Sequence, residues 1–231
     1  MLGILKSNNK YNDNLREYSK KDGILALTLF VIVMIMYSII GLLYKNNSFI
    51  KENIKIFGII FNFILIIITI LFVKCNKQKL NSIGFCGRWI LSIILGGILG
   101  MFYFYCNCLS HLIEGAKLIS INKILFLAIY FLFVAASEEI VFRGYIGTRL
   151  NGLIKNKYVT LFLTGILFVF MHFPYRMIVA NMSLVDFDIG WLINLFIFHL
   201  MMSFIYMKTN SIFGSIIPHW ISDLAYEIVM K

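Results

Sequence analysis

Ionisable side chains interrupt the apolar run around residues 135–144. Glu138 and Glu139 are adjacent, and Arg143 follows them. On a helix Glu139 and Arg143, four residues apart, share a face and can pair, whereas Glu138 points about 100° away from that face. A purely structural ion pair would account for Glu139 and Arg143 but would leave Glu138 unexplained. We therefore consider Glu138 a candidate general base, a role that carboxylates often fill in enzymes.

His172 lies in a second apolar run, four residues after Phe168. A single histidine in such a run is more often a packing residue than a ligand. The position of His172 in its run nevertheless favours a functional role. Lys155 lies at the centre of the polar turn between the two runs, and it is equally far along the chain from Glu138 and from His172. If both runs are helices, both side chains lie about 25 Å from the tip of this hairpin. We expect them to lie side by side.

His219 and Asp223 form a third polar pair, again four residues apart and on one face of a helix. Taken alone, the pair could be a hydrogen bond that joins two helices. Acid–base residues in three separate apolar runs favour a catalytic function more strongly than one such pair does. For His199 we expect packing or a hydrogen bond, and for His111 a place at the membrane interface.

The elements that carry these residues are suited to lipid. Of the 231 residues, 60% are apolar and only 14% are charged, with a mean hydropathy of +0.86, whereas soluble domains are about 45–50% apolar and about 25% charged. No strand alternation is visible, and a lipid-exposed backbone favours helices. We predict an all-α polytopic membrane protein with about seven transmembrane helices. Their ranges are about 24–44, 54–73, 89–109, 123–148, 158–173, 189–207 and 211–230, with the fifth extending through Pro174.

The net charge of +10 is spread over loops, without the basic stripe typical of nucleic-acid binding. Most Lys and Arg residues fall in the N-terminal tail, in loops 74–88 and 149–157, and at Lys208, all on one side of the predicted topology. The positive-inside rule therefore predicts a cytoplasmic N-terminus and an exterior C-terminus. Residues 1–22 form a polar cytoplasmic tail before a retained first span, and residues 23–119 form the N-terminal transmembrane helices. The four cysteines lack CxxC spacing and predict no disulfide framework.

The three motifs resemble those of the CAAX prenyl protease and bacteriocin-processing family of intramembrane proteases, also called the Abi family. The family motifs are Glu-Glu-x-x-x-Arg, Phe-x-x-x-His and His-x-x-x-Asn or Asp. They correspond here to Glu138–Arg143, Phe168–His172 and His219–Asp223, in that order. The resemblance implies a CAAX protease/Abi-like catalytic domain at residues 120–231, with an intramembrane cavity formed by the last four helices.

The resemblance also implies roles for these residues in an endopeptidase that cleaves a membrane-associated peptide or protein. Glu138 would activate water, and His172 would help to hold it. His219 and Asp223 would stabilise the oxyanion, while Glu139 and Arg143 would brace the site. Asp223 departs from the many members that have Asn. We expect it to be protonated, to orient His219, or to serve a metal.

The same resemblance leaves the cofactor open, because the family has been described both as metalloproteases and as metal-independent glutamate proteases. Zinc would use His172, His219 and either Glu138 or Asp223, a set of three ligands with an open position. No HExxH spacing is present, so we favour a site without metal.

Two other function classes compete with a protease. One is a non-catalytic scaffold for a membrane partner protein or a bacteriocin self-immunity protein of the same family. The other is a proton-coupled carrier, since buried ionisable groups also mark proton relays, but inverted repeats are absent. The presence of Glu138, His172 and His219 favours catalysis. The resemblance also suggests the plasma membrane of a bacterium as the location.

Overall fold

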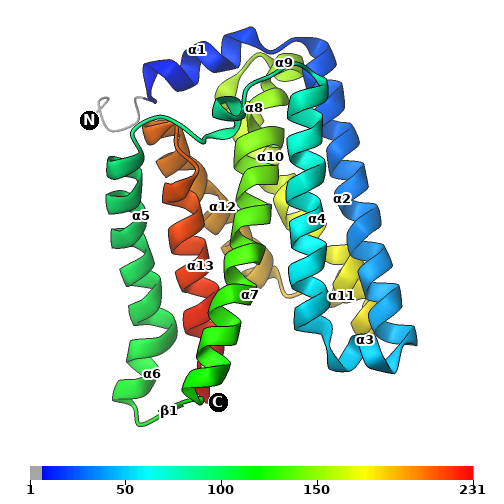
Figure 1. Cartoon of the computed structure of the whole chain (residues 1–231), viewed down its shortest axis with the longest axis vertical. Helices are drawn as coiled ribbons and strands as arrows, with labels where there is room; N and C mark the ends of the chain where they lie inside the picture. The colour runs from blue at the N-terminus through cyan, green and yellow to red at the C-terminus, as the bar shows by residue number, and fades with distance from the viewer. Residues whose placement is uncertain (1–6, 231) are drawn as a thin grey trace.

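The apolar runs form long helices, and the computed structural model describes residues 7–230 (Figure 1). Three of the runs are single helices: α2 (Lys20–Asn46), α4 (Ile54–Cys75) and α12 (Ile189–Thr209). A capping box between Ser19 and Asp22 sets the start of α2. These helices expose apolar side chains over most of their length because lipid, not water, is their solvent.

The other three runs are built from successive helical segments. α5 (Trp89–Phe104) continues through the π-helix η2 (Tyr105–Leu109) into α6 (Ser110–Ile113). α7 (Ile121–Glu139) continues through the π-helix η3 (Ile140–Ile146) into α8 (Gly147–Arg149) and α9 (Asn151–Ile154). α10 (Lys157–Met171) is followed by α11 (Phe173–Ala180), so the fifth run extends through Pro174 as predicted.

These six runs are long and apolar enough to cross a membrane, and among the described residues no seventh helix reaches that length. The chain is therefore an all-α polytopic membrane protein, as predicted. The seventh predicted span corresponds to α13 (Phe213–Glu227), which has 15 residues. At 1.5 Å per residue it measures about 22 Å, less than the roughly 30 Å hydrocarbon core.

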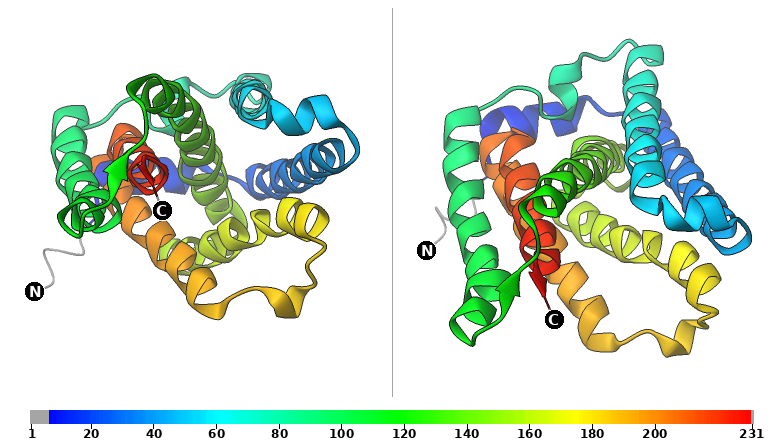
Figure 2. Two further views of the ribbon diagram at one scale, coloured as in Figure 1. Left: turned by 90° about the horizontal axis from the view of Figure 1, so that it is seen from below. Right: turned by 60° about the horizontal axis from the view of Figure 1, so that its bottom comes forward.

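α13 is enclosed by neighbours and packs mainly against α5 and α7. Gly96 of α5 lies against Gly214 of α13, and a Cβ atom at Gly96 would stand 2.7 Å from the Gly214 carbonyl oxygen. Small residues of this kind let two membrane helices approach closely. In the views of Figure 2, α7 lies between the α2–α4 pair and the α5–α13 pair, and α11 and α12 lie opposite it.

The short elements gather at the two ends of the bundle (Figure 1). At one end lie α1 (Asn9–Glu17), the turn at Lys155 and the loop with η1 (Leu80–Ile83). We call this the α1 end. At the opposite end, the C-terminal end, lie α3 (Ser48–Glu52) and a two-stranded antiparallel ladder of β1 (Lys117–Leu118) and β2 (Val229–Met230). A 3-10 turn, η4 (Leu184–Asp186), links α11 and α12.

The described part of the polar N-terminal tail contains a helix, α1, that its composition did not suggest. α1 buries Tyr11 and Leu15 against the bundle, and the described part of the tail is therefore a docked helix.

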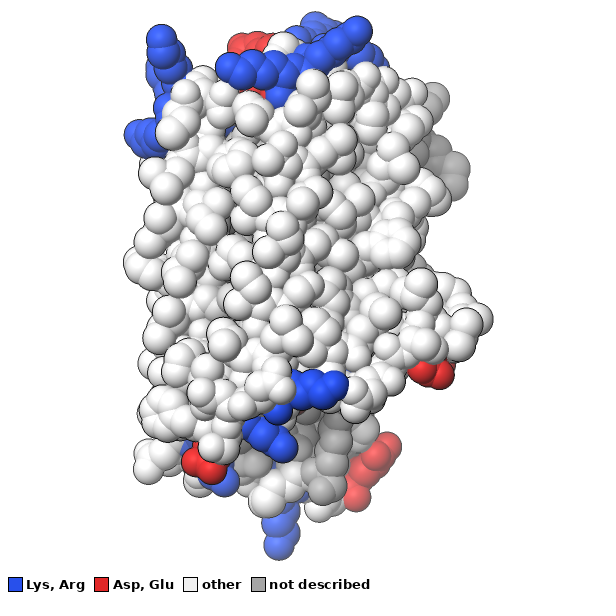
Figure 3. All heavy atoms as spheres, turned by 90° about the vertical axis from the view of Figure 1, so that its right-hand side faces the viewer, with Lys and Arg blue, Asp and Glu red and all other residues white. Residues whose placement is uncertain are grey.

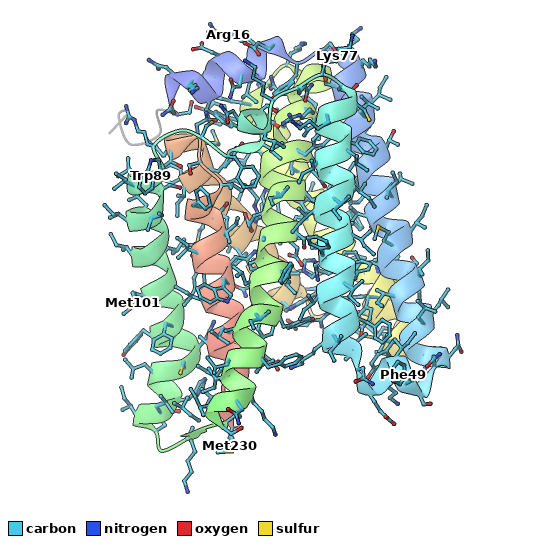
Figure 4. All side chains as sticks on the ribbon, in the orientation of Figure 1. Arg16, Phe49, Lys77, Trp89, Met101 and Met230 are labelled. Atoms are coloured by element: carbon cyan, nitrogen blue, oxygen red, sulfur yellow. The ribbon has the colours of Figure 1, made fainter. Side chains whose placement is uncertain are left out.

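The surface matches the membrane assignment. Figure 3 shows a broad face without charge between charged ends. On α5 the labelled side chains of Trp89 and Met101 point outward from the bundle in Figure 4 and are 55% and 65% exposed. The buried core lies between α2, α4, α7, η3, α10 and α12, and it surrounds the segment that carries Glu138 and Arg143.

Candidate active site

A cavity of about 600 Å³ lies between α7, α10, α11, α12 and α13, the helices of the last four predicted spans, and Asn107 of η2 also lines it. Its wall includes Glu138, His172, His219 and Asp223, the four residues predicted to act on water or on the oxyanion. The other lining residues are Phe131, Val134, Phe168, Arg176, Trp191, Asn194, Leu195, Phe198, Ser222, Tyr226 and Glu227. Residues from all three motifs of the sequence therefore line the same cavity.

Glu138 lies in the last turn of α7, immediately before the π-helix η3. Its side chain is 8% exposed, and its Oε2 atom is 3.7 Å from Nε2 of His219. The Tyr37 hydroxyl, from α2, donates to the other oxygen, Oε1, at 3.4 Å. Single π-helical turns inside α-helices occur often at functional sites. Here the wider turn follows the two glutamates directly.

Glu139 and Arg143 pair as their spacing predicts, but they lie behind the cavity wall. Oε1 of Glu139 is 3.0 Å from Nη1 of Arg143, and both side chains are fully buried. The same oxygen lies 2.7 Å from Nδ1 of His219. The guanidinium of Arg143 also stacks on the Phe168 ring, 4.4 Å from its centroid. The pair thus connects η3, α10 and α13, which fits a bracing role.

His172 lies between α10 and α11, at the point where the run is interrupted. Pro174 lacks a backbone N–H and cannot continue the hydrogen-bond ladder of α10. The Nδ1 atom of His172 is 2.9 Å from the Phe168 carbonyl oxygen. A carbonyl only accepts hydrogen bonds, so Nδ1 carries the proton and Nε2 keeps its lone pair. His172 is therefore set up to accept a hydrogen bond.

His219 and Asp223 face the cavity from α13. Nε2 of His219 lies 3.5 Å from Oδ2 of Asp223, and the His219 ring meets the Phe198 ring edge to face at 4.9 Å. With Nδ1 at Glu139, the imidazole is held from both sides. Asp223 is more open, with a side chain 31% exposed.

The remaining histidines have other environments. His199 is buried and its Nε2 atom is 3.2 Å from the Ser203 hydroxyl, in keeping with the predicted hydrogen-bonded role. His111 is exposed and lies 3.6 Å from Glu114. All four cysteines are free.

Several cavity residues escaped the sequence analysis. Trp191 and Arg176 form a cation–π contact of 4.0 Å at the wall, and Asn194 and Asn107 add amides. The two asparagines could have been noticed as polar residues in apolar runs. Tyr37, which contacts Glu138 without lining the cavity, was also missed, since a tyrosine in a membrane helix is ordinary and its partner is 101 positions away.

The arrangement does not fit a metal ion. Among residues 7–230, no three His, Cys, Asp or Glu side chains are arranged so that they could hold one. Both nitrogens of His219 face carboxylates, and Nδ1 of His172 faces a carbonyl. The zinc set considered from the sequence, His172 and His219 with Glu138 or Asp223, is therefore not preassembled.

The cavity extends toward the C-terminal end of the bundle. Its lining runs from Glu138 and His219 to Trp191, near the start of α12, and to Glu227, the last residue of α13. Glu227 is paired there with Lys55 at 3.4 Å. Both the start of α12 and the end of α13 face away from α1 (Figure 1).

Comparison with known proteins agrees with this geometry. Residues 120–225 match the family model described as type II CAAX prenyl endopeptidase Rce1-like. Neither the curated proteins nor the solved structures gave a match to the chain. The matched region contains all three motifs, and the family supports CAAX-type intramembrane protease activity in general, on a peptide or protein in a membrane. Over residues 120–225 the chain is therefore similar to the Rce1-like type II CAAX prenyl endopeptidase family.

Proposed function

We propose that this protein is an intramembrane endopeptidase that hydrolyses a peptide bond in a membrane-associated peptide or protein, with Glu138 as the general base. One observation carries the proposal: Glu138, His172 and His219 line one cavity, and the first two belong to helical runs long and apolar enough to cross a membrane. Ionisable residues are costly there and are found where function needs them.

The first step is attack by water. A water molecule in the cavity donates one hydrogen bond to the Glu138 carboxylate and another to Nε2 of His172, which keeps its lone pair. Glu138 takes the proton as the water oxygen bonds to the peptide carbonyl carbon. The C=O π-electrons move to oxygen and give a tetrahedral intermediate with an oxyanion.

In this mechanism His219 stabilises that oxyanion. Its Nδ1–H donates to Glu139, and a ring protonated on Nε2 as well presents a second N–H toward the cavity. Donors fixed before the reaction stabilise developing charge most effectively. Asp223, 3.5 Å from Nε2, orients the ring. An ionised carboxylate has no proton to donate, so its direct contribution to the oxyanion requires protonation.

Collapse of the intermediate completes the reaction. The C–N bond breaks, and the proton held by Glu138 passes to the leaving nitrogen, so that one water is consumed and an amine and a carboxylate are released. Glu138 returns to its ionised form. Each step of this sequence is carried out by water and by the chain's own residues.

The test is cleavage by purified protein in lipid nanodiscs. A library of membrane peptides is offered to wild type, Glu138→Gln and His172→Ala, each with and without chelator. Removing a general base costs typically 10²–10⁴-fold in rate, so we expect Glu138→Gln to lose at least a hundredfold. Cleavage that survives both substitutions would refute the proposal, and chelator inhibition reversed by zinc would replace the metal-free mechanism with a zinc-dependent one.

A further inference from the structure

Glu138 has a hydrogen-bonding partner outside the matched domain. Tyr37 belongs to α2, and its hydroxyl donates to Oε1 of Glu138 at 3.4 Å. Tyr37 does not line the cavity, whereas Glu138 does. The hydroxyl therefore holds the carboxylate from the protein side, while Oε2 faces His219 at 3.7 Å.

The Tyr37 ring is itself fixed by packing. It meets the Phe61 ring of α4 edge to face, with 5.0 Å between centroids, and it packs on the main buried core. A tyrosine has few rotatable bonds, so these contacts determine where its hydroxyl points. A displacement of about 1 Å at a reacting group can cost about a hundredfold in rate.

A second polar contact supports the same segment from α4. The hydroxyl of Ser137, the residue before Glu138, donates to Oδ1 of Asn62. Asn62 is buried, and its amide nitrogen donates to the Gly58 carbonyl at 2.8 Å, which fixes the orientation of its side chain. The helices α2 and α4 thus each place one polar group at the turn that presents Glu138.

From these contacts we propose that Tyr37 is a positioning residue for Glu138, and that α2 and α4 are part of the catalytic unit. The inference rests on the proposed role of Glu138 as base. By holding Oε1, Tyr37 keeps Oε2 directed at the water position in the cavity. Asn62 acts one residue earlier by fixing the backbone turn at Ser137.

The test is a comparison of two Tyr→Phe variants. Tyr37→Phe removes the hydroxyl and keeps the packed ring. Tyr103→Phe is the matched control, since its hydroxyl contacts Met201 at 3.5 Å and its ring packs on Phe198. We expect kcat to fall about tenfold for Tyr37→Phe, as for a hydrogen bond to a charged group, with KM unchanged. Tyr103→Phe should keep kcat within twofold of wild type.

A double-mutant cycle with Glu138→Asp separates positioning from a general structural role. The shorter carboxylate cannot reach the Tyr37 hydroxyl, so Tyr37→Phe should cost little in that background. Equal losses in both backgrounds, or a rise in KM without a fall in kcat, would overturn the inference. If Glu138→Gln keeps full activity in the same assay, the proposed function fails; if only the Tyr37 effect is missing, the function stands and this inference fails.

Discussion

At the scale of single residues, we expect Glu139 to contribute to stability and Glu138 to contribute to catalysis. It is fully buried and is the acidic partner of both Arg143 and His219, at 3.0 and 2.7 Å. Glu138, its neighbour, faces the cavity and has no pairing this close. The two adjacent glutamates therefore have different tasks, and substitution of each should affect a different measurement.

We predict that Glu139→Gln lowers the free energy of unfolding by about 3–5 kcal/mol, because it leaves the Arg143 guanidinium buried without a counter-charge. Thermal unfolding in detergent micelles measures the loss. Glu138→Gln is the matched control, since it makes the same change one residue earlier and should lower the unfolding temperature much less. Replacing Arg143 by Met together with Glu139→Gln should recover most of the stability. An unfolding temperature for Glu139→Gln equal to that of Glu138→Gln would show that the ion pair contributes no net stability.

At the scale of helices, the position of His219 and Asp223 depends on how closely α13 approaches α5. Three glycines make this approach possible. Gly96 and Gly100 of α5 would place a Cβ atom within 2.7 Å of α13 atoms, and Gly214 of α13 would do the same with Ser92. Because α13 is too short to span the membrane alone, this contact and the one with α7 determine its place.

Gly96→Ala and Gly97→Ala form a matched test of this contact. A methyl group at Gly96 meets the Gly214 backbone at 2.7 Å, whereas the position of a Cβ at Gly97 is open to 4 Å. We predict that Gly96→Ala separates the helices, lowers the unfolding temperature by several degrees and reduces kcat severalfold. Gly97→Ala should be neutral or slightly stabilising, since alanine favours helix by about 1 kcal/mol over glycine. The same behaviour in both variants would exclude the close contact as a determinant of the site.

The helices that contain the motifs were largely predictable from the sequence. Apolar runs predicted the membrane segments, and equal distances from Lys155 predicted that Glu138 and His172 lie close together; in the structure both line one cavity. Lys155 adopts a left-handed conformation (φ 57°) at the end of α9, at the centre of the predicted turn. The membrane segments were predictable because hydropathy determines which segments suit a lipid environment.

Other features were not predictable because they depend on tertiary contacts. The docking of α1 was missed, although Tyr11, Leu15 and Tyr18 recur at the spacing of one helix face. Which part of the bundle would cover that face depends on tertiary contacts. The π-helical turns at Tyr105 and Ile140 follow no simple spacing, and the first brings Asn107 to the cavity. Tyr37 reaches Glu138 only because α2 packs beside η3.

At the scale of the whole molecule, the distribution of charge predicts the side on which the cavity opens. The loops richest in Lys and Arg, at residues 74–88 and 149–157, lie with α1 at one end of the bundle (Figure 1). The lining of the cavity extends toward the other end, to Trp191 and Glu227. If the positive-inside rule holds for this chain, the α1 end is cytoplasmic. We then expect the substrate to enter the cavity from the exterior side.

Cysteine accessibility tests this orientation in intact cells. In a variant with the native cysteines replaced, a single cysteine is introduced at Asn47 or at Lys79, which are both exposed and lie at opposite ends of the bundle. A membrane-impermeant maleimide should label Asn47→Cys in intact cells and Lys79→Cys only after permeabilisation. The reverse pattern would place the α1 end outside, against its excess of basic residues, and would move the expected side of cleavage to the cytoplasm. Because the two sites bracket the membrane, labelling of both in intact cells would contradict the spanning topology itself.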